Sequence, residues 1–173
     1  METLTQFLSI TIPAAAVLFA MYLTIKAFLN KEFQQKKIEI RLKNQELILP
    51  ARLQAYERVC LLLERISPTN LIPRVNDSSY TVAELQAVLL GSVREEFHHN
   101  ISQQVYMSDQ SWNLVKNAIQ EVTTLINKSA QNLNKEDKGI ELARVVIDNA
   151  RQAKNDPIGL ALTFVKNEIR QLY

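Results

Sequence analysis

The only two histidines of the chain, His98 and His99, lie in the segment Glu95-Glu96-Phe97-His98-His99. Glu96 and His99 are three residues apart, which places them on one face of a helix with the E-x-x-H spacing of carboxylate-bridged metal centres. Such a centre also requires a second E-x-x-H and two further carboxylates, and the sequence contains no second copy. We therefore expect a polar cluster at a helix surface or end. A metal site within one subunit, or shared across a symmetric oligomer, is the alternative.

Other residues that could carry chemistry are isolated in the sequence. The single cysteine, Cys60, has no histidine at a suggestive position and lies in an apolar run, so we expect a small buried hydrophobic side chain. The three glycines, Gly91, Gly139 and Gly159, are too far apart to form a phosphate-binding loop. We assign no catalytic, cofactor-binding or metal-binding residue, expect no cofactor, and predict that the protein is not an enzyme.

Residues 8–28 form an apolar stretch of about 20 residues in which Lys26 is the one charged side chain. A helix of that length crosses a hydrocarbon core of about 30 Å. The preceding residues METLTQF contain no lysine or arginine, unlike the start of a cleaved signal peptide. The sequence therefore predicts a retained transmembrane helix.

The excess positive charge of the chain follows this stretch directly. Residues 29–43 contain two acidic side chains and five basic ones, which are Lys31, Lys36, Lys37, Arg41 and Lys43. By the positive-inside rule, this places the N-terminus outside and the rest of the chain in the cytoplasm. We expect the five basic residues to contact the membrane surface. The remainder is close to neutral, which argues against nucleic acid as a partner.

The segment after the apolar stretch, residues 30–48, contains no helix breaker. Phe33, Ile40 and Leu47 share a heptad spacing, but Lys36, Lys37 and Asn44 lie beside them. The preferred interpretation is a solvated helical stalk, and a self-associating coiled coil is the alternative, because good heptads are few.

Residues 49–66 carry the strongest helical stripe of the remaining chain, which we expect to be the core helix. The stripe has one ridge of Leu49, Leu53, Tyr56, Cys60 and Leu63, and Val59, Leu62 and Ile66 lie beside it. We predict that Pro50 restarts or kinks the helix, and that residues 67–79, which include Pro68 and Pro73, form a loop.

Helix starts are indicated by capping residues. Thr81 with Glu84 forms a capping box, Ser108 is a second cap, and Asp156 precedes Pro157 at a third start. Asn134 is predicted to cap a further helix. The helix after Thr81 has apolar residues every four positions, namely Leu85, Leu89, Val93, Phe97, Ile101 and Val105.

The last predicted helix, after Pro157, has more apolar surface than one contact face requires. Ile158, Leu162, Val165, Ile169 and Leu172 suffice to pack it on a bundle. Leu160 and Phe164 lie on a different side and are therefore the candidate protein interface, unless the helix is buried on two sides.

Together these patterns predict an all-α protein with a transmembrane anchor at 1–29, a basic helical stalk at 30–48 and a cytoplasmic bundle of about five helices at 49–173. Residues 49–74, LPARLQAYERVCLLLERISPTNLIPR, with EFHHNISQQVYMS at 96–108 and Trp112, resemble a family of short single-span inner-membrane proteins of Gram-negative bacteria. That resemblance covers about residues 49–115 and the preceding span. It implies a bacterial inner-membrane helical protein and no assigned activity.

We therefore expect a membrane-anchored scaffolding or adaptor protein that binds other proteins or itself at the cytoplasmic face of the inner membrane. The expected partners are membrane lipid and either a second copy or the other subunits of a membrane complex. Two alternatives are an accessory subunit of a transport, secretion or energy-converting complex and, less favoured, a metal-dependent helical enzyme that uses Glu96 and His99.

Overall fold

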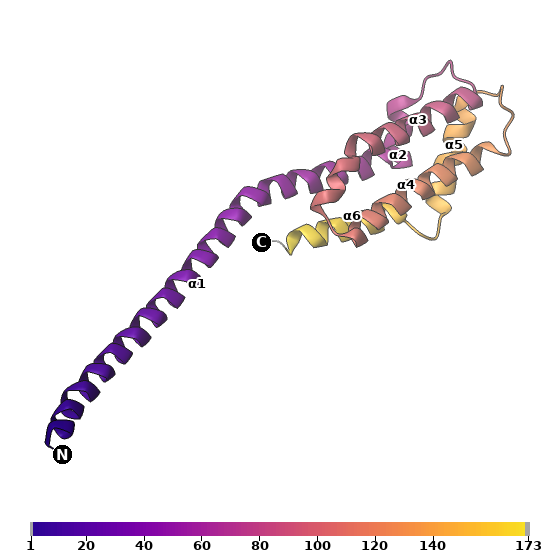
Figure 1. The fold of residues 1–173 in the computed structure, drawn as a ribbon. Helices are drawn as coiled ribbons and strands as arrows, with labels where there is room; N and C mark the ends of the chain where they lie inside the picture. The colour runs from indigo at the N-terminus through magenta and orange to yellow at the C-terminus, as the bar shows by residue number, and fades with distance from the viewer. Residues whose placement is uncertain (1, 172–173) are drawn as a thin grey trace. The chain divides into compact units, whose positions relative to one another are not determined.

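The computed structural model describes residues 2–171, without the side chains of residues 2–5, 7–8, 10 and 44–45. The described chain is helical and contains no strand, which confirms the predicted all-α class (Figure 1). Its elements are α1 (Glu2–Ile66), α2 (Pro68–Val75), α3 (Val82–Asn100), the 3₁₀ helix η1 (Ile101–Tyr106), α4 (Asp109–Ala130), α5 (Gly139–Gln152) and α6 (Pro157–Arg170).

The chain divides into two compact units, Met1–Leu49 and Pro50–Tyr173. The first unit consists of α1 alone, and every described side chain from Ile12 to Ile48 is exposed. This helix is long and apolar enough to cross a membrane. We predicted a restart or a kink at Pro50; the helix assignment continues through this residue, so the restart is wrong.

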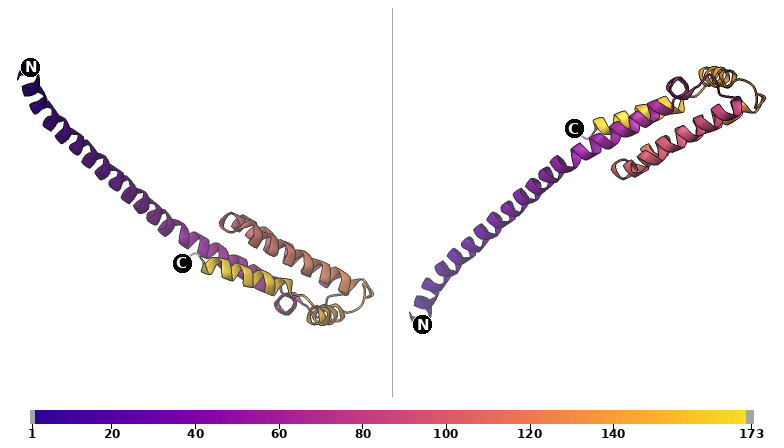
Figure 2. Two further views of the ribbon diagram at one scale, coloured as in Figure 1. Left: turned by 90° about the horizontal axis from the view of Figure 1, so that it is seen from below. Right: turned by 90° about the horizontal axis from the view of Figure 1, so that it is seen from above.

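The second unit, here called the bundle, is built from the last part of α1 and from α2 to α6. In both views of Figure 2, α6 lies beside the end of α1. Helices α3 and α4 pack on each other, and Figure 1 shows them side by side. Helix α4 packs against both α3 and α6, while α2 and α5 close one end. The described residues of this unit form six α-helices, one more than the predicted number of about five, because α2 was not foreseen.

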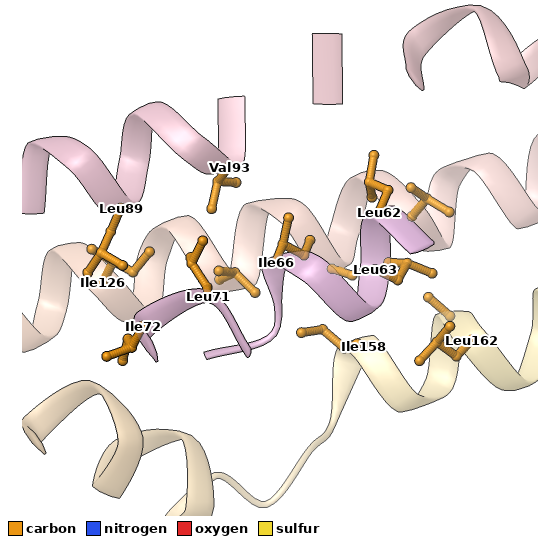
Figure 3. Packing of buried hydrophobic residues seen from close by; sticks show 14 of the residues in the cluster. Leu62, Leu63, Ile66, Leu71, Ile72, Leu89, Val93, Ile126, Ile158 and Leu162 are labelled. Atoms are coloured by element: carbon orange, nitrogen blue, oxygen red, sulfur yellow. The ribbon is translucent and has the colours of Figure 1, made fainter. Parts of the chain in front are cut away.

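One hydrophobic cluster joins all six helices of the bundle. Figure 3 shows Leu62, Leu63 and Ile66 of α1 between side chains of the other helices. Leu63 and Ile66 are both fully buried. The last part of α1 is therefore the core helix, as predicted for residues 49–66.

The buried face of α1 is rotated relative to the predicted stripe. The buried residues are Ala55, Tyr56, Val59, Leu62, Leu63 and Ile66. Leu53 is 40% exposed, so its assignment to the core ridge is wrong, whereas Cys60 is half-buried and packs against the core. At about 100° per residue, Leu53 lies about 60° beyond the edge of this face. The sequence alone does not fix which face of α1 is buried, because the consecutive leucines Leu61, Leu62 and Leu63 point to different sides of the helix.

Helix α2 occupies most of the segment predicted as a loop. Pro68 stands in its first turn, where a missing N–H has no cost. Leu71 and Ile72 are buried in the core, which stabilises a short helix that contains Pro73. The prediction of a loop was wrong because the two prolines are compatible with a short helix that buries Leu71 and Ile72.

Three predicted helix starts are confirmed. The Thr81 Oγ1 accepts from the Glu84 amide at 3.3 Å, and the Thr81 amide donates to the Glu84 carboxylate at 2.9 Å. Ser108 Oγ accepts from the Ser111 amide at 3.1 Å, and Asp156 Oδ1 accepts from the Gly159 amide at 2.9 Å. Each cap satisfies an amide that the first helical turn leaves unpaired.

The predicted cap at Asn134 is wrong, because α5 begins five residues later at Gly139. The chain before α5 pairs instead with the start of α3. The Gly139 amide donates to Tyr80 O at 2.7 Å, and the Val82 amide donates to Asp137 O at 2.8 Å. A Cβ at Gly139 would lie 2.9 Å from Tyr80 O, so this close approach requires glycine.

The apolar repeat of the α3 segment also ends earlier than predicted. Leu85, Leu89 and Val93 are buried, whereas Ile101 and Val105 are 43% and 79% exposed. Both exposed residues lie in η1, whose three-residue turns no longer keep positions four apart on one face.

We predict that Leu63→Ala lowers the free energy of unfolding by about 2–5 kcal/mol, because a fully buried side chain leaves a cavity. Leu53→Ala serves as the matched control on the same helix and should change it by less than about 1 kcal/mol. Urea unfolding followed by the fluorescence of Trp112, the single tryptophan, measures both. Equal losses in the two variants would contradict the observed register.

Candidate functional site

The carboxylate of Glu168, on α6, lies at the centre of a polar cluster in the bundle. Glu168 accepts hydrogen bonds from the Ser108 amide at 2.9 Å, from the Ser108 hydroxyl at 3.1 Å and from the Ser111 hydroxyl. Ser111 is fully buried in the first turn of α4. The carboxylate therefore ties the end of α6 to the start of α4.

Two side chains of α1 adjoin this cluster. Tyr56 is buried, and its hydroxyl lies beside the Glu168 carboxylate, although it forms no hydrogen bond of standard geometry within the described chain. Arg52 donates from Nε to Tyr106 O at 3.1 Å and so ties α1 to η1. Burial raises the pKa of Tyr56, the Glu168 carboxylate raises it further, and Arg52 opposes the shift.

The pKa of Glu168 lies below its ordinary value. Burial alone would raise it, but the hydrogen bonds from Ser111 and Ser108, together with the adjacent Tyr56, outweigh that effect. A carboxylate with several donors and a low pKa is a weak base. The arrangement is suited to fixing α6 against α1 and the start of α4, rather than to proton transfer.

The candidate metal-ligating residue Glu96 is engaged by two arginines. Its Oε1 lies 2.8 Å from Arg65 Nε and 3.5 Å from Arg74 Nη1, which joins α3 to α1 and α2. His98 and His99 are exposed. Within the part of the chain that the structure describes, no group of three or more possible ligands could hold a metal ion. The predicted polar cluster is thus an ion-pair junction between helices.

Cys60 lies beside the core and is half-buried rather than fully buried. Burial raises the pKa of its thiol, while Lys166 acts in the opposite direction. A raised pKa keeps the sulfur protonated at neutral pH and lowers its reactivity.

The candidate interface residue Leu160 lines an open groove of about 750 Å³ between α4 and the start of α6. Leu160 is 61% exposed, and Leu114 and Pro157 adjoin it. We call this the α4–α6 groove; its lining is Leu114, Asn117, Glu121, Ala153, Lys154, Asn155, Asp156, Pro157 and Leu160. A second hollow of about 350 Å³ shares five of these residues and extends the groove toward Pro68 and Leu125.

Phe164, the other candidate interface residue, is half-buried and does not line the groove. The rest of the predicted packing face of α6 is mostly buried. Ile158, Leu162 and Val165 belong to the core and Ile169 packs against it, whereas Leu172 falls outside the described residues. The five basic residues proposed for the membrane surface are all exposed on α1: Lys31, Lys36, Lys37, Arg41 and Lys43.

Comparison with protein families places the chain in one family. The profile of a family of unknown function, DUF7935, matches residues 2–172. The chain belongs to DUF7935. This confirms the predicted membership of an uncharacterised family, and the DUF7935 match covers both units of the structure. Neither a search of curated proteins nor a search of solved structures gave a match.

Sequence reasoning missed the cluster around Glu168. Ser108 was recognised as a cap, but its second bond to a residue about 60 positions away leaves no local pattern. The available signal was weak: Glu168 lies on the packing side of α6, three residues after the buried Val165. An acidic residue at such a position requires donors when the helix packs.

We predict that stability depends on the charge of Glu168. Since its pKa is lower in the folded chain, the stabilisation is complete above the pKa of the unfolded chain and is lost as pH falls through the lower folded pKa. Glu168→Gln should lower stability at pH 7 by about 1–3 kcal/mol and flatten the decline between pH 5 and pH 3.

Glu57→Gln is the matched control, because Glu57 is exposed on α1. Urea unfolding across this pH range compares both variants with the parent chain. If the stability of Glu168→Gln fell with acid as steeply as that of the parent chain, the ionised Glu168 would not be the source of the pH dependence.

Proposed function

We propose that the protein is a membrane-anchored adaptor whose bundle binds another protein at the cytoplasmic face of a bacterial inner membrane. The α4–α6 groove is the observation that carries the proposal. It places an exposed leucine in a hollow with a polar rim, and an exposed apolar patch of this kind is typical of an interaction surface.

The chemistry of the groove defines the kind of partner. Leu160, Leu114 and Pro157 offer apolar contact for one inserted side chain. The rim carries Glu121 and Asp156 together with Lys154, so both signs of charge are present. A protein segment with an apolar anchor and flanking polar groups fits this surface, whereas a highly charged ligand of one sign does not.

Anchorage rests on the apolar part of α1. Its side chains from Ile12 to Phe28 are exposed, with Val17, Leu18 and Phe19 between 62% and 67% exposed. A helix satisfies its own backbone hydrogen bonds, so such a surface is stable in hydrocarbon. The basic residues that follow favour a cytoplasmic bundle.

The unbroken helix also orders the basic residues by distance from the membrane. At about 1.5 Å per residue, Lys31 lies about 5 Å along α1 from Phe28, and Lys43 about 22 Å. Lys31 therefore reaches the headgroups first. Electrostatic attraction to anionic lipid decays over about 8–10 Å, so the later residues contribute progressively less.

We predict that Leu160→Glu abolishes capture of the partner by the full chain in mild detergent while leaving the bundle folded, since Leu160 is 61% exposed. Ile140→Glu is the matched control, because Ile140 is 50% exposed on α5 and does not line the groove. Co-purified proteins are compared by mass spectrometry, and Trp112 fluorescence checks folding. Equal retention of every co-purified protein in both variants would remove the groove from the proposal.

We predict that a reporter fused after Tyr173 is active in the cytoplasm and silent in the periplasm. Three lysines inserted before residue 8 should weaken or invert this preference, because flanking positive charge sets the orientation. Periplasmic activity of the unmodified fusion would contradict the cytoplasmic placement of the bundle.

A further inference from the structure

The stalk, residues 30–48 of α1, exposes an unusual amount of apolar surface outside the apolar stretch. Six large apolar side chains of this segment are between 52% and 74% exposed. They are Phe33, Ile38, Ile40, Leu42, Leu47 and Ile48. A single helix in water gains little from its own backbone bonds, and helices are normally stabilised by packing an apolar face. A partner that covers one apolar face of this segment would therefore stabilise it.

Three of these residues recur at a strict interval of seven. Phe33, Ile40 and Leu47 are 70%, 59% and 74% exposed, and the helix is unbroken between them. A seven-residue repeat keeps side chains on one slowly drifting stripe, which is the a position of a coiled coil. The corresponding d positions hold Lys36 and Lys43.

The charges beside the stripe follow the same interval. Glu32, Glu39 and Glu46 immediately precede the three apolar residues and occupy the g positions. Lys37, five residues after Glu32, occupies an e position. In a parallel pair of helices, a g residue meets the e residue five positions later on the other chain. Glu32 of one copy and Lys37 of another would thus meet with opposite charge.

The seam lysines have acidic neighbours on their own helix. Glu32 and Glu39 stand four residues before Lys36 and Lys43, with the glutamate on the N-terminal side, which is the favourable orientation of such a pair. A two-chain seam is narrow enough for long lysine stems to pack while their ammonium groups reach water. Larger assemblies enclose these positions more completely, so two chains fit best.

We propose that the stalk pairs in parallel and in register with the stalk of a second copy of this chain. The pairing rests on the proposed membrane anchor, because two copies anchored in one bilayer point the same way and start at the same height. Confinement to the bilayer raises the effective concentration of the second stalk, which compensates for the two polar seam positions.

Lipid does not cover this stripe. On a helix that continues the span, Leu47 lies about 28 Å beyond Phe28, whereas the headgroup layer on one side of a bilayer is only about 5–8 Å thick. Phe33 can approach the headgroups, but Ile40 and Leu47 cannot. A second copy is the occupant that matches both the apolar repeat and the Glu32–Lys37 pair.

The test traps neighbouring copies by disulfide formation in the full chain. Cys60→Ala removes the native thiol, and Ile40→Cys is then compared with Ile38→Cys, which places the thiol on the outer side of the same helix. Proteoliposomes with a large excess of lipid are treated with copper phenanthroline, which oxidises two thiols to one disulfide. We expect Ile40→Cys to form a covalent dimer at least about tenfold faster than Ile38→Cys.

Phe33→Cys and Leu47→Cys should also cross-link rapidly, so that the rate repeats every seven residues. Equal rates for Ile38→Cys and Ile40→Cys, or no dimer from Ile40→Cys, would overturn the pairing. Resistance of the protein to alkaline extraction from the liposomes tests the anchor separately. Anchored protein that does not cross-link would remove the pairing alone, whereas extracted protein would remove the anchor and the pairing with it.

Discussion

The bundle depends on the packing of the last turns of α1 against its other helices. Tyr56, Val59, Leu63 and Ile66 enter a core that all the other helices of the bundle share. Removing this helix would expose the inner faces of its neighbours to water, a loss of the dominant favourable term in folding. Because these residues end a helix that begins at Glu2, the core and the proposed anchor are parts of one element.

Polar contacts fix how the helices meet around that core. Glu168 joins α6 to the start of α4, and Glu96 joins α3 to α1 and α2. Each carboxylate receives more than one donor, which offsets the cost of partial burial. Both glutamates therefore specify the arrangement of helices, and no described contact assigns either of them to a reaction.

Most of the predictions that the structure confirms depend on residues that are close together in the sequence. The apolar stretch, the capping box of Thr81 and the caps at Ser108 and Asp156 depend on residues within one or two turns, so the sequence shows them directly. The register of Leu53, the helix at Pro68–Val75 and the donors of Glu168 depend on distant segments. Leu160 is an intermediate case: the excess of apolar residues on α6 left open whether its side of the helix is exposed or buried, and its groove also depends on α4.

Residues 8–28 of α1 are proposed to lie in lipid and the following residues in water, and spin labels in bilayers measure these surroundings directly. Labels at Leu18 and Gln35, both exposed in the structure, are read by their collisions with oxygen and with a water-soluble nickel chelate. A membrane anchor predicts high oxygen and low nickel accessibility at Leu18, and the reverse at Gln35. Nickel accessibility at Leu18 as high as at Gln35 would place residues 8–28 in water and contradict the membrane anchor.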